Sequence, residues 1–138
     1  MYNGKFKEKT ERITEDTMSR RILVVDDDAM NLRMAEFILK QKEYEVLKAD
    51  SGMKCLDILK SEKVDLVLLD IEMPVMSGIE TLEKIRADKE FAKLPVMFLS
   101  ASADDDTLEE ADKLGAVDYV KKPFMPQDLQ ARVAKVMD

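Results

Sequence analysis

Five polar residues of types that bind metal ions and phosphoryl groups stand at the ends of predicted strands. They are Asp26 and Asp27 after residues 22–25, Asp70 after residues 66–69, Ser100 after residues 96–99, and Lys122 after residues 117–121. Carboxylates held close together repel one another unless a cation lies among them, and Mg²⁺ is the natural candidate for such oxygen ligands. A lysine and a serine beside that cation are suited to hold phosphoryl oxygens, and a carboxylate can itself be the nucleophile. The residue types therefore predict Mg²⁺-dependent phosphoryl transfer, provided that the fold brings them together.

The apolar runs alternate with longer amphipathic segments along the chain. Strands are predicted at residues 22–25, 44–49, 66–69, 96–99 and 117–121, and helices at residues 30–42, 53–61, about 79–85, 105–114 and 126–136. Continuous apolar runs are typical of strands buried on both faces, and parallel strands need crossover connections. We therefore expect an α/β fold, a five-stranded parallel sheet with helices on both faces. Ligands of such sheets bind outside the carboxyl ends of the strands, where the polar residues would meet.

The composition excludes several other classes of function. The chain of 138 residues contains 22 Lys and Arg, 29 Asp and Glu, no His and one Cys, so its net charge is -7. It cannot build a structural zinc site, a Ser-His-Asp or Cys-His nucleophile, or a phosphohistidine of its own. The acidic balance also argues against direct, sequence-independent binding of nucleic acid by this chain.

The charge pattern divides the chain into two parts. Residues 1–19 are predicted to form a polar leader or linker, flexible or partly helical, and residues 20–138 to form one domain. No window approaches the ~18 consecutive apolar residues of a membrane span, and the first residues lack the apolar core of a signal peptide. We therefore expect a cytoplasmic domain, large enough to bury a hydrophobic core without disulfides.

Four segments, in order and at matching spacing, resemble the receiver domain of bacterial two-component response regulators. They are residues 22–28, which end in Asp26-Asp27-Asp28; residues 65–78, which include Asp70-Ile71-Glu72-Met73-Pro74; Ser100-Ala101; and residues 115–124, which end in Lys122-Pro123-Phe124. The resemblance covers residues 21 to about 137 and implies a (βα)5, flavodoxin-like, doubly wound fold. It also implies a phosphoprotein of a phosphorelay, which takes a phosphoryl group from a sensor histidine kinase or a histidine phosphotransfer protein and switches conformation to control an output partner.

The resemblance assigns roles to the acidic residues. Asp70 matches the phosphoacceptor, and Asp27 matches the residue that ligates Mg²⁺ directly. Asp26 matches the neighbour that acts on the metal through water, and Glu72 the residue that supplies a backbone carbonyl. Such a receiver is no metabolic enzyme and catalyses only its own aspartyl phosphorylation and dephosphorylation.

The resemblance also assigns roles to residues of the later strands. Lys122 matches the phosphoryl-binding lysine, and its peptide bond to Pro123 is typically cis in the family. Ser100 matches the hydroxyl that moves toward the phosphoryl group, and Tyr119 the aromatic switch that turns inward with it. Two positions depart from the commonest pattern. Ser100 stands where Thr is frequent, and Glu72 places an acidic group near the phosphoryl, at a position that tunes phosphoryl lifetime in the family.

Other interpretations stay open from the sequence. Asp26 and Asp28 form an Asp-x-Asp pattern after an apolar run, which resembles the haloacid-dehalogenase phosphohydrolases with Asp26 as nucleophile, although Asp70 would then have no role. A degenerate receiver that acts purely as an interaction module is a further alternative. Asp28 is predicted to favour the start of a helix rather than to bind metal. Asp118 and Arg132 resemble charges that some regulators use for dimer pairing, so a phosphorylation-dependent homodimer is also considered.

Overall fold

The computed structural model describes residues 20–138, and the predicted leader, residues 1–19, lies outside this part. The strands are β1 (Arg21–Val25), β2 (Glu45–Ala49), β3 (Leu66–Asp70), β4 (Val96–Ser100) and β5 (Asp118–Lys121). The helices are α2 (Ala29–Lys40), α3 (Gly52–Ser61), α4 (Gly78–Ala87), α5 (Asp105–Lys113) and α6 (Pro126–Met137), with the short 3₁₀ helix η1 (Lys89–Phe91) between α4 and β4. None of the helices among residues 20–138 has the length and the apolar character of a membrane-spanning segment.

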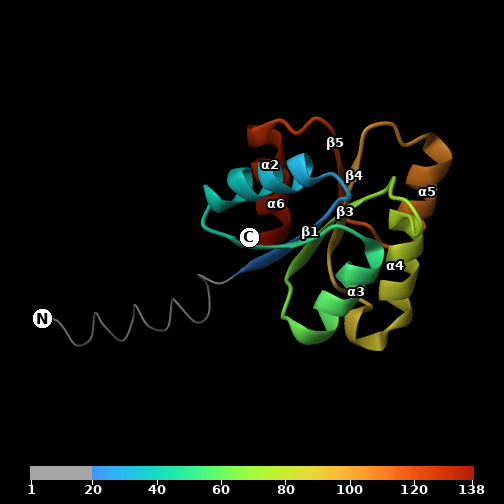
Figure 1. Ribbon diagram of the computed structural model, residues 1–138. Helices are drawn as coiled ribbons and strands as arrows, with labels where there is room; N and C mark the ends of the chain where they lie inside the picture. The colour runs from blue at the N-terminus through green and yellow to red at the C-terminus, as the bar shows by residue number, and fades with distance from the viewer. Residues whose placement is uncertain (1–19) are drawn as a thin grey trace, which may run out of the picture.

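The strands form one parallel sheet in the order β2-β1-β3-β4-β5. Figure 1 shows α2 and α6 on one face of this sheet and α3, α4 and α5 on the other. The predicted doubly wound α/β fold is therefore confirmed. The order reverses between β1 and β3, because the chain first adds β2 on one side of β1 and then returns to its other side. This reversal is the switch point at which open parallel sheets bind their ligands.

The side chains of the central strands β1, β3 and β4 separate into two hydrophobic clusters, one on each face of the sheet. Successive residues of a strand point to opposite faces. Val24 and Leu68 accordingly pack in the cluster that includes α2 and α6, whereas Val25, Leu69 and Phe98 pack in the cluster that includes α3, α4 and α5. Because both faces are covered, these strands are continuously apolar, which is the pattern that predicts them.

Polar residues explain where several of the helices begin. Asp28 caps α2 and Asp104 caps α5, each by accepting a hydrogen bond from a backbone N–H of the first turn. Ser77 and Glu80 form a reciprocal capping box at the start of α4. The prediction that Asp28 favours a helix start is confirmed. The helix η1, capped by Asp88, was not predicted, because three residues are too few to show a hydrophobic period.

Candidate functional site

The carboxyl ends of β1 and β3 bring three carboxylates together. Asp26 and Asp27 follow β1, Asp70 ends β3, and one oxygen of each lies within 4.8 Å of those of the other two. Asp26 is fully buried and Asp70 is 1% exposed, whereas Asp27 is exposed to solvent. Two neighbouring strands therefore place the three acidic residues singled out in the sequence at the switch point of the sheet.

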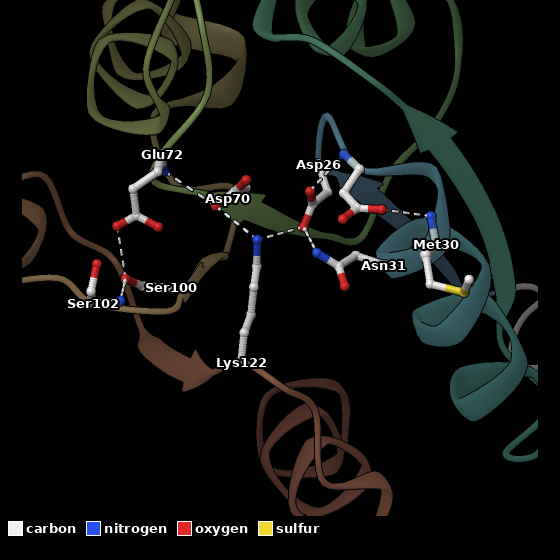
Figure 2. Close-up of polar contacts among 9 residues, drawn as sticks. Asp26, Met30, Asn31, Asp70, Glu72, Ser100, Ser102 and Lys122 are labelled. Atoms are coloured by element: carbon white, nitrogen blue, oxygen red, sulfur yellow. Dashed lines mark hydrogen bonds and ion pairs between the residues drawn. The ribbon is translucent and has the colours of Figure 1, made fainter.

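Lys122 supplies the positive charge of this acidic cluster. It follows β5, and its Nζ lies 2.8 Å from Asp26 Oδ2 and 3.1 Å from Asp70 Oδ1. Figure 2 shows its side chain directed to both carboxylates. Its backbone N–H donates to the carbonyl oxygen of Ser100 at 2.9 Å, and its peptide bond to Pro123 is cis. The ammonium thus bridges two buried carboxylates from a backbone that is fixed to the end of β4.

Asp26 is also held by the start of α2. The backbone N–H of Asp28 donates to Asp26 Oδ1 at 2.9 Å, and the side-chain amide of Asn31 donates to Asp26 Oδ2 at 3.3 Å. No site role was predicted for Asn31. Its place in the first turn of α2, directly after the acidic pair, is the signal that could have identified it. These contacts, together with Lys122, satisfy both oxygens of a carboxylate that has no access to water.

A glycine allows α4 to begin very close to Asp70. A Cβ at Gly78 would lie 2.2 Å from the Asp70 carbonyl oxygen and 2.8 Å from Ile71 Cα, which are overlaps with backbone. The Gly78 N–H donates to the Ile71 carbonyl oxygen at 2.9 Å. The lack of a side chain therefore lets residues 71–77 fold back as a tight loop beside the acidic cluster.

Burial shifts the pKa of two groups in the cluster. Burial and the charge of Asp26 raise the pKa of Asp70 from 3.8 to about 7, and this outweighs the opposing effect of Lys122. Burial lowers the pKa of Lys122, but its hydrogen bonds and charge interactions with Asp26 and Asp70 outweigh burial and raise it overall. Lys122 is therefore charged at neutral pH, whereas Asp70 is only partly ionised there unless another cation approaches.

The acidic cluster fits a hard divalent cation. Its three carboxylates exceed the single ammonium by two negative charges when all are ionised. Mg²⁺ prefers oxygen ligands, needs only one or two carboxylates from the protein and keeps water at its other positions. A divalent cation here would neutralise the excess charge and favour the ionised form of Asp70.

Ser100 ends β4 with its hydroxyl directed to Glu72. Its Oγ donates to Glu72 Oε2 at 2.9 Å and accepts from the backbone N–H groups of Ser102 at 3.1 Å and Ala103 at 2.8 Å. Tyr119 on β5 is 42% exposed, and it lines a cavity of about 330 Å³ together with Ser100 and Ala103. The contact between Glu72 and Ser100 was not predicted, because it depends on the direction of a loop side chain.

The sequence is similar to those of known signalling regulators. A profile of the response regulator receiver domain matches residues 22–134. The chain is 38% identical over 118 residues to the DNA-binding response regulator MtrA of Mycobacterium tuberculosis, covering 86% of this chain and 50% of that protein. It is 33% identical over 120 residues to the alkaline phosphatase synthesis transcriptional regulatory protein PhoP of Bacillus subtilis, covering 87% and 49%. The chain thus spans about half the length of these relatives.

Solved structures of similar proteins have the same fold. The chemotaxis protein CheY4 of Vibrio cholerae superposes with a TM-score of 0.82 at 27% identity, over 86% of this chain and 98% of that one. The receiver domain of a sensor histidine kinase from Pseudomonas aeruginosa, solved with a magnesium ion coordinated in its active site cleft, has a TM-score of 0.78 at 27% identity, over 86% and 98%.

These findings do not favour the two alternatives left open by the sequence. A haloacid dehalogenase with Asp26 as nucleophile would leave Asp70 without a role, yet Asp70 lies in the same acidic cluster and 3.1 Å from Lys122 Nζ. A degenerate receiver would not need the three carboxylates and the lysine that meet at the switch point. Fold, acidic cluster and sequence similarity agree, and the chain belongs to the response regulator receiver domain family.

Proposed function

We propose that Asp70 accepts a phosphoryl group from a phosphohistidine of a sensor histidine kinase or a histidine phosphotransfer protein. The observation that carries the proposal is the position of Asp70, whose buried carboxylate lies beside two other carboxylates and 3.1 Å from Lys122 Nζ. The chain has no His, so the donor imidazole comes from another protein. An Asp70 oxygen forms a P–O bond as the P–N bond breaks, and the released imidazole takes up a proton from solvent.

Each residue of the site has a role in this reaction. Asp27 and Asp70 would ligate Mg²⁺ directly, Asp26 through water, and Glu72 through its backbone carbonyl. The metal, when bound, neutralises charge on the phosphoryl oxygens. Lys122 holds one phosphoryl oxygen with its ammonium, and Asp26, at 2.8 Å, keeps that ammonium in place. The domain thereby catalyses its own phosphorylation and, by admitting water to the same site, its own dephosphorylation.

Phosphorylation would operate a switch on the β4 and β5 side of the site. The phosphorylated side chain carries a charge of about -1.5 to -2, by analogy with side-chain phosphates, in place of the single charge of the carboxylate. This charge draws the Ser100 hydroxyl inward, and Tyr119 turns into the space beside Ser100, which favours one of two conformations. The shared cavity of Ser100 and Tyr119 supports this coupling. The face formed by α5, β5 and α6 would then control the output partner.

Transfer from a phosphohistidine donor tests the proposal. A phosphotransfer protein carrying labelled phosphohistidine is mixed with the chain and Mg²⁺, and label is followed on both proteins. We expect label to move to the wild type and to Asp57→Asn, an exposed control on α3, but not to Asp70→Asn. Hydroxylamine should release it, because it cleaves an acyl phosphate and leaves a serine phosphate intact. Label that resists hydroxylamine, or that persists in Asp70→Asn but not in Asp26→Asn, would refute Asp70 as acceptor.

The same proposal places the chain in the cytoplasm and includes a homodimer of the phosphorylated form. Kinases that make phosphohistidine from ATP act in the cytoplasm, and the proposed donor supports that location. Asp118 and Arg132 lie on the proposed output face, where Arg132 Nη1 is 2.9 Å from Asp118 Oδ1 of the same chain. In a dimer joined by these charges, Arg132 of one copy would pair with Asp118 of the second copy instead of with Asp118 of its own chain.

A further inference from the structure

The hydroxyl of Ser100 has no hydrogen-bonding capacity left in this structure. A serine hydroxyl carries one proton and two lone pairs. The proton is donated to Glu72 Oε2 at 2.9 Å, and the oxygen accepts from the N–H groups of Ser102 at 3.1 Å and Ala103 at 2.8 Å. Ser100 is only 4% exposed, so water does not compete freely for these positions. While the hydroxyl donates to Glu72, it has no proton to donate to a phosphoryl oxygen.

Glu72 reaches both the proposed phosphoacceptor and Ser100. Its backbone N–H donates to Asp70 Oδ1 at 3.2 Å, and its side-chain carboxylate accepts from Ser100. Figure 2 shows Glu72 in contact with both Asp70 and Ser100. Its side chain thus joins the loop of residues 71–77 to the end of β4. The contact is a charge-assisted hydrogen bond, which is stronger than a hydrogen bond between neutral groups.

We infer that Glu72 is a latch that holds Ser100 in the unphosphorylated position by acting as a substitute for the phosphoryl group. This inference rests on the proposed function and adds the contact that opposes the switch. On phosphorylation, the Ser100 hydroxyl keeps its proton but donates its hydrogen bond to a phosphoryl oxygen instead of to the Glu72 carboxylate. The new anion also repels the Glu72 carboxylate, so the loss of the latch and the arrival of the phosphoryl group reinforce one another.

The latch predicts a specific effect on binding of a phosphoryl mimic. Beryllofluoride with Mg²⁺ is titrated into the full chain, and binding is followed by ¹⁹F NMR. Glu72→Ala should bind the mimic about tenfold more tightly than the wild type. In the wild type, binding must first break the hydrogen bond from Ser100 to the charged Glu72 carboxylate, and the variant lacks this bond. Glu72→Gln keeps a neutral acceptor for Ser100 and should lie between the two. Glu83→Gln, which removes an exposed charge on α4, should bind like the wild type.

A double-mutant cycle separates the latch from simple charge repulsion. If Glu72 acts through the Ser100 hydroxyl, the gain from Glu72→Ala should fall to about twofold or less when Ser100 is already Ala. An equal gain in both backgrounds would show that the Glu72 charge acts on the anion alone, and the latch would be wrong. Equal binding by the wild type, Glu72→Ala and Glu72→Gln would also refute it while leaving the proposed function intact.

Backbone amide signals report the latch without any ligand. The N–H groups of Ser102 and Ala103 bond to Ser100 Oγ, so their chemical shifts follow the position of that hydroxyl. In free Glu72→Ala these two signals should move toward their positions in the beryllofluoride-bound wild type. Signals that stay at the free wild-type positions would contradict the latch. If the wild type itself fails to bind beryllofluoride with Mg²⁺, the proposed phosphoacceptor function fails, which is a separate result.

Discussion

The fold opposes the ionisation of the Asp70 side chain. Burial and the neighbouring Asp26 raise its pKa from 3.8 to about 7. The pKa in the folded protein therefore exceeds that in the unfolded chain. The preference of the folded state for the protonated Asp70 carboxyl contributes to the free energy of unfolding. This contribution is fully present below pH 3.8 and is lost as the pH rises through about 7. The free domain is thus less stable at neutral pH than it would be with a neutral group in place of the ionised Asp70 carboxylate.

Replacement of Asp70 by Asn should expose this cost. We predict that Asp70→Asn is more stable than the wild type by about 1 to 3 kcal/mol at pH 8 without metal, because the amide carries no charge to bury. The difference should shrink toward pH 4, where the wild-type carboxyl is protonated. Urea unfolding at several pH values measures it, with Asp57→Asn as the exposed control. A difference that does not change with pH would contradict the prediction.

Mg²⁺ should compensate for the same cost. At pH 8, a concentration about 100 times the dissociation constant should raise the free energy of unfolding of the wild type by about 2.7 kcal/mol. Asp27→Asn removes an exposed carboxylate of the cluster and should lose most of this stabilisation, whereas Asp57→Asn should keep it. Thermal unfolding with Mg²⁺ and with a chelator measures the effect. Equal stabilisation of Asp27→Asn and the wild type would place the metal elsewhere.

At the residue scale, the site residues that could be predicted from the sequence are those at the ends of strands. Asp26, Asp70 and Lys122 stand at or directly after the ends of strands, and these strand ends determine where they lie. The contact of Glu72 with Ser100 joins a loop residue to the end of β4 and depends on side-chain directions that no periodic pattern encodes. The resemblance to a family indicated that Glu72 matters near the phosphoryl group, but it did not indicate its partner.

At the scale of the elements, Arg86 fixes the loops at the end of the sheet opposite the site. Its guanidinium donates to the carbonyl oxygens of Leu114 at 2.8 Å, Phe91 at 3.0 Å, Leu94 at 2.8 Å and Gly115 at 3.2 Å. These carbonyls belong to the segments before β4 and β5. One side chain on α4 thereby ties both connections to the body of the domain.

Loss of this guanidinium should destabilise the domain. We predict that Arg86→Ala lowers the free energy of unfolding by about 2 to 4 kcal/mol, because several partly buried carbonyl oxygens lose a charged donor. Arg86→Lys keeps the charge but presents fewer donors in one plane and should lie between. Arg33→Ala, at an exposed position on α2, should change stability by less than about 0.5 kcal/mol. Urea unfolding gives all three values, and a near-neutral Arg86→Ala would contradict this role.

The elements themselves were predictable where hydrophobic pattern decides them. All five strands and the five longer helices lie within a few residues of their predicted bounds, because both faces of the sheet are buried and each helix buries one stripe. The Arg86 contacts could not be predicted, since an arginine late in an amphipathic helix usually faces solvent. The helix η1 escaped prediction because the cap at Asp88, and not a period, defines it.

At the scale of the whole molecule, the proposed output face carries an ion pair whose two partners belong to the same chain. Arg132 bonds to Asp118 at 2.9 Å and to Asp128 at 3.0 Å. We predict that the chain is a monomer when free and a dimer when loaded with Mg²⁺ and beryllofluoride, and that Arg132→Ala weakens this dimer. Sedimentation velocity at micromolar concentrations measures the change, with Arg33→Ala as control. An unchanged sedimentation coefficient on loading would contradict the proposed dimer.

The central claim is that the switch point of this sheet makes Asp70 a phosphoacceptor. Intact mass spectrometry after incubation with acetyl phosphate and Mg²⁺ tests it most directly, because this small donor needs no partner protein. We predict one added phosphoryl group on the wild type and none on Asp70→Asn or on the wild type with a chelator. No adduct on the wild type, or an adduct that Asp70→Asn retains, would contradict the claim.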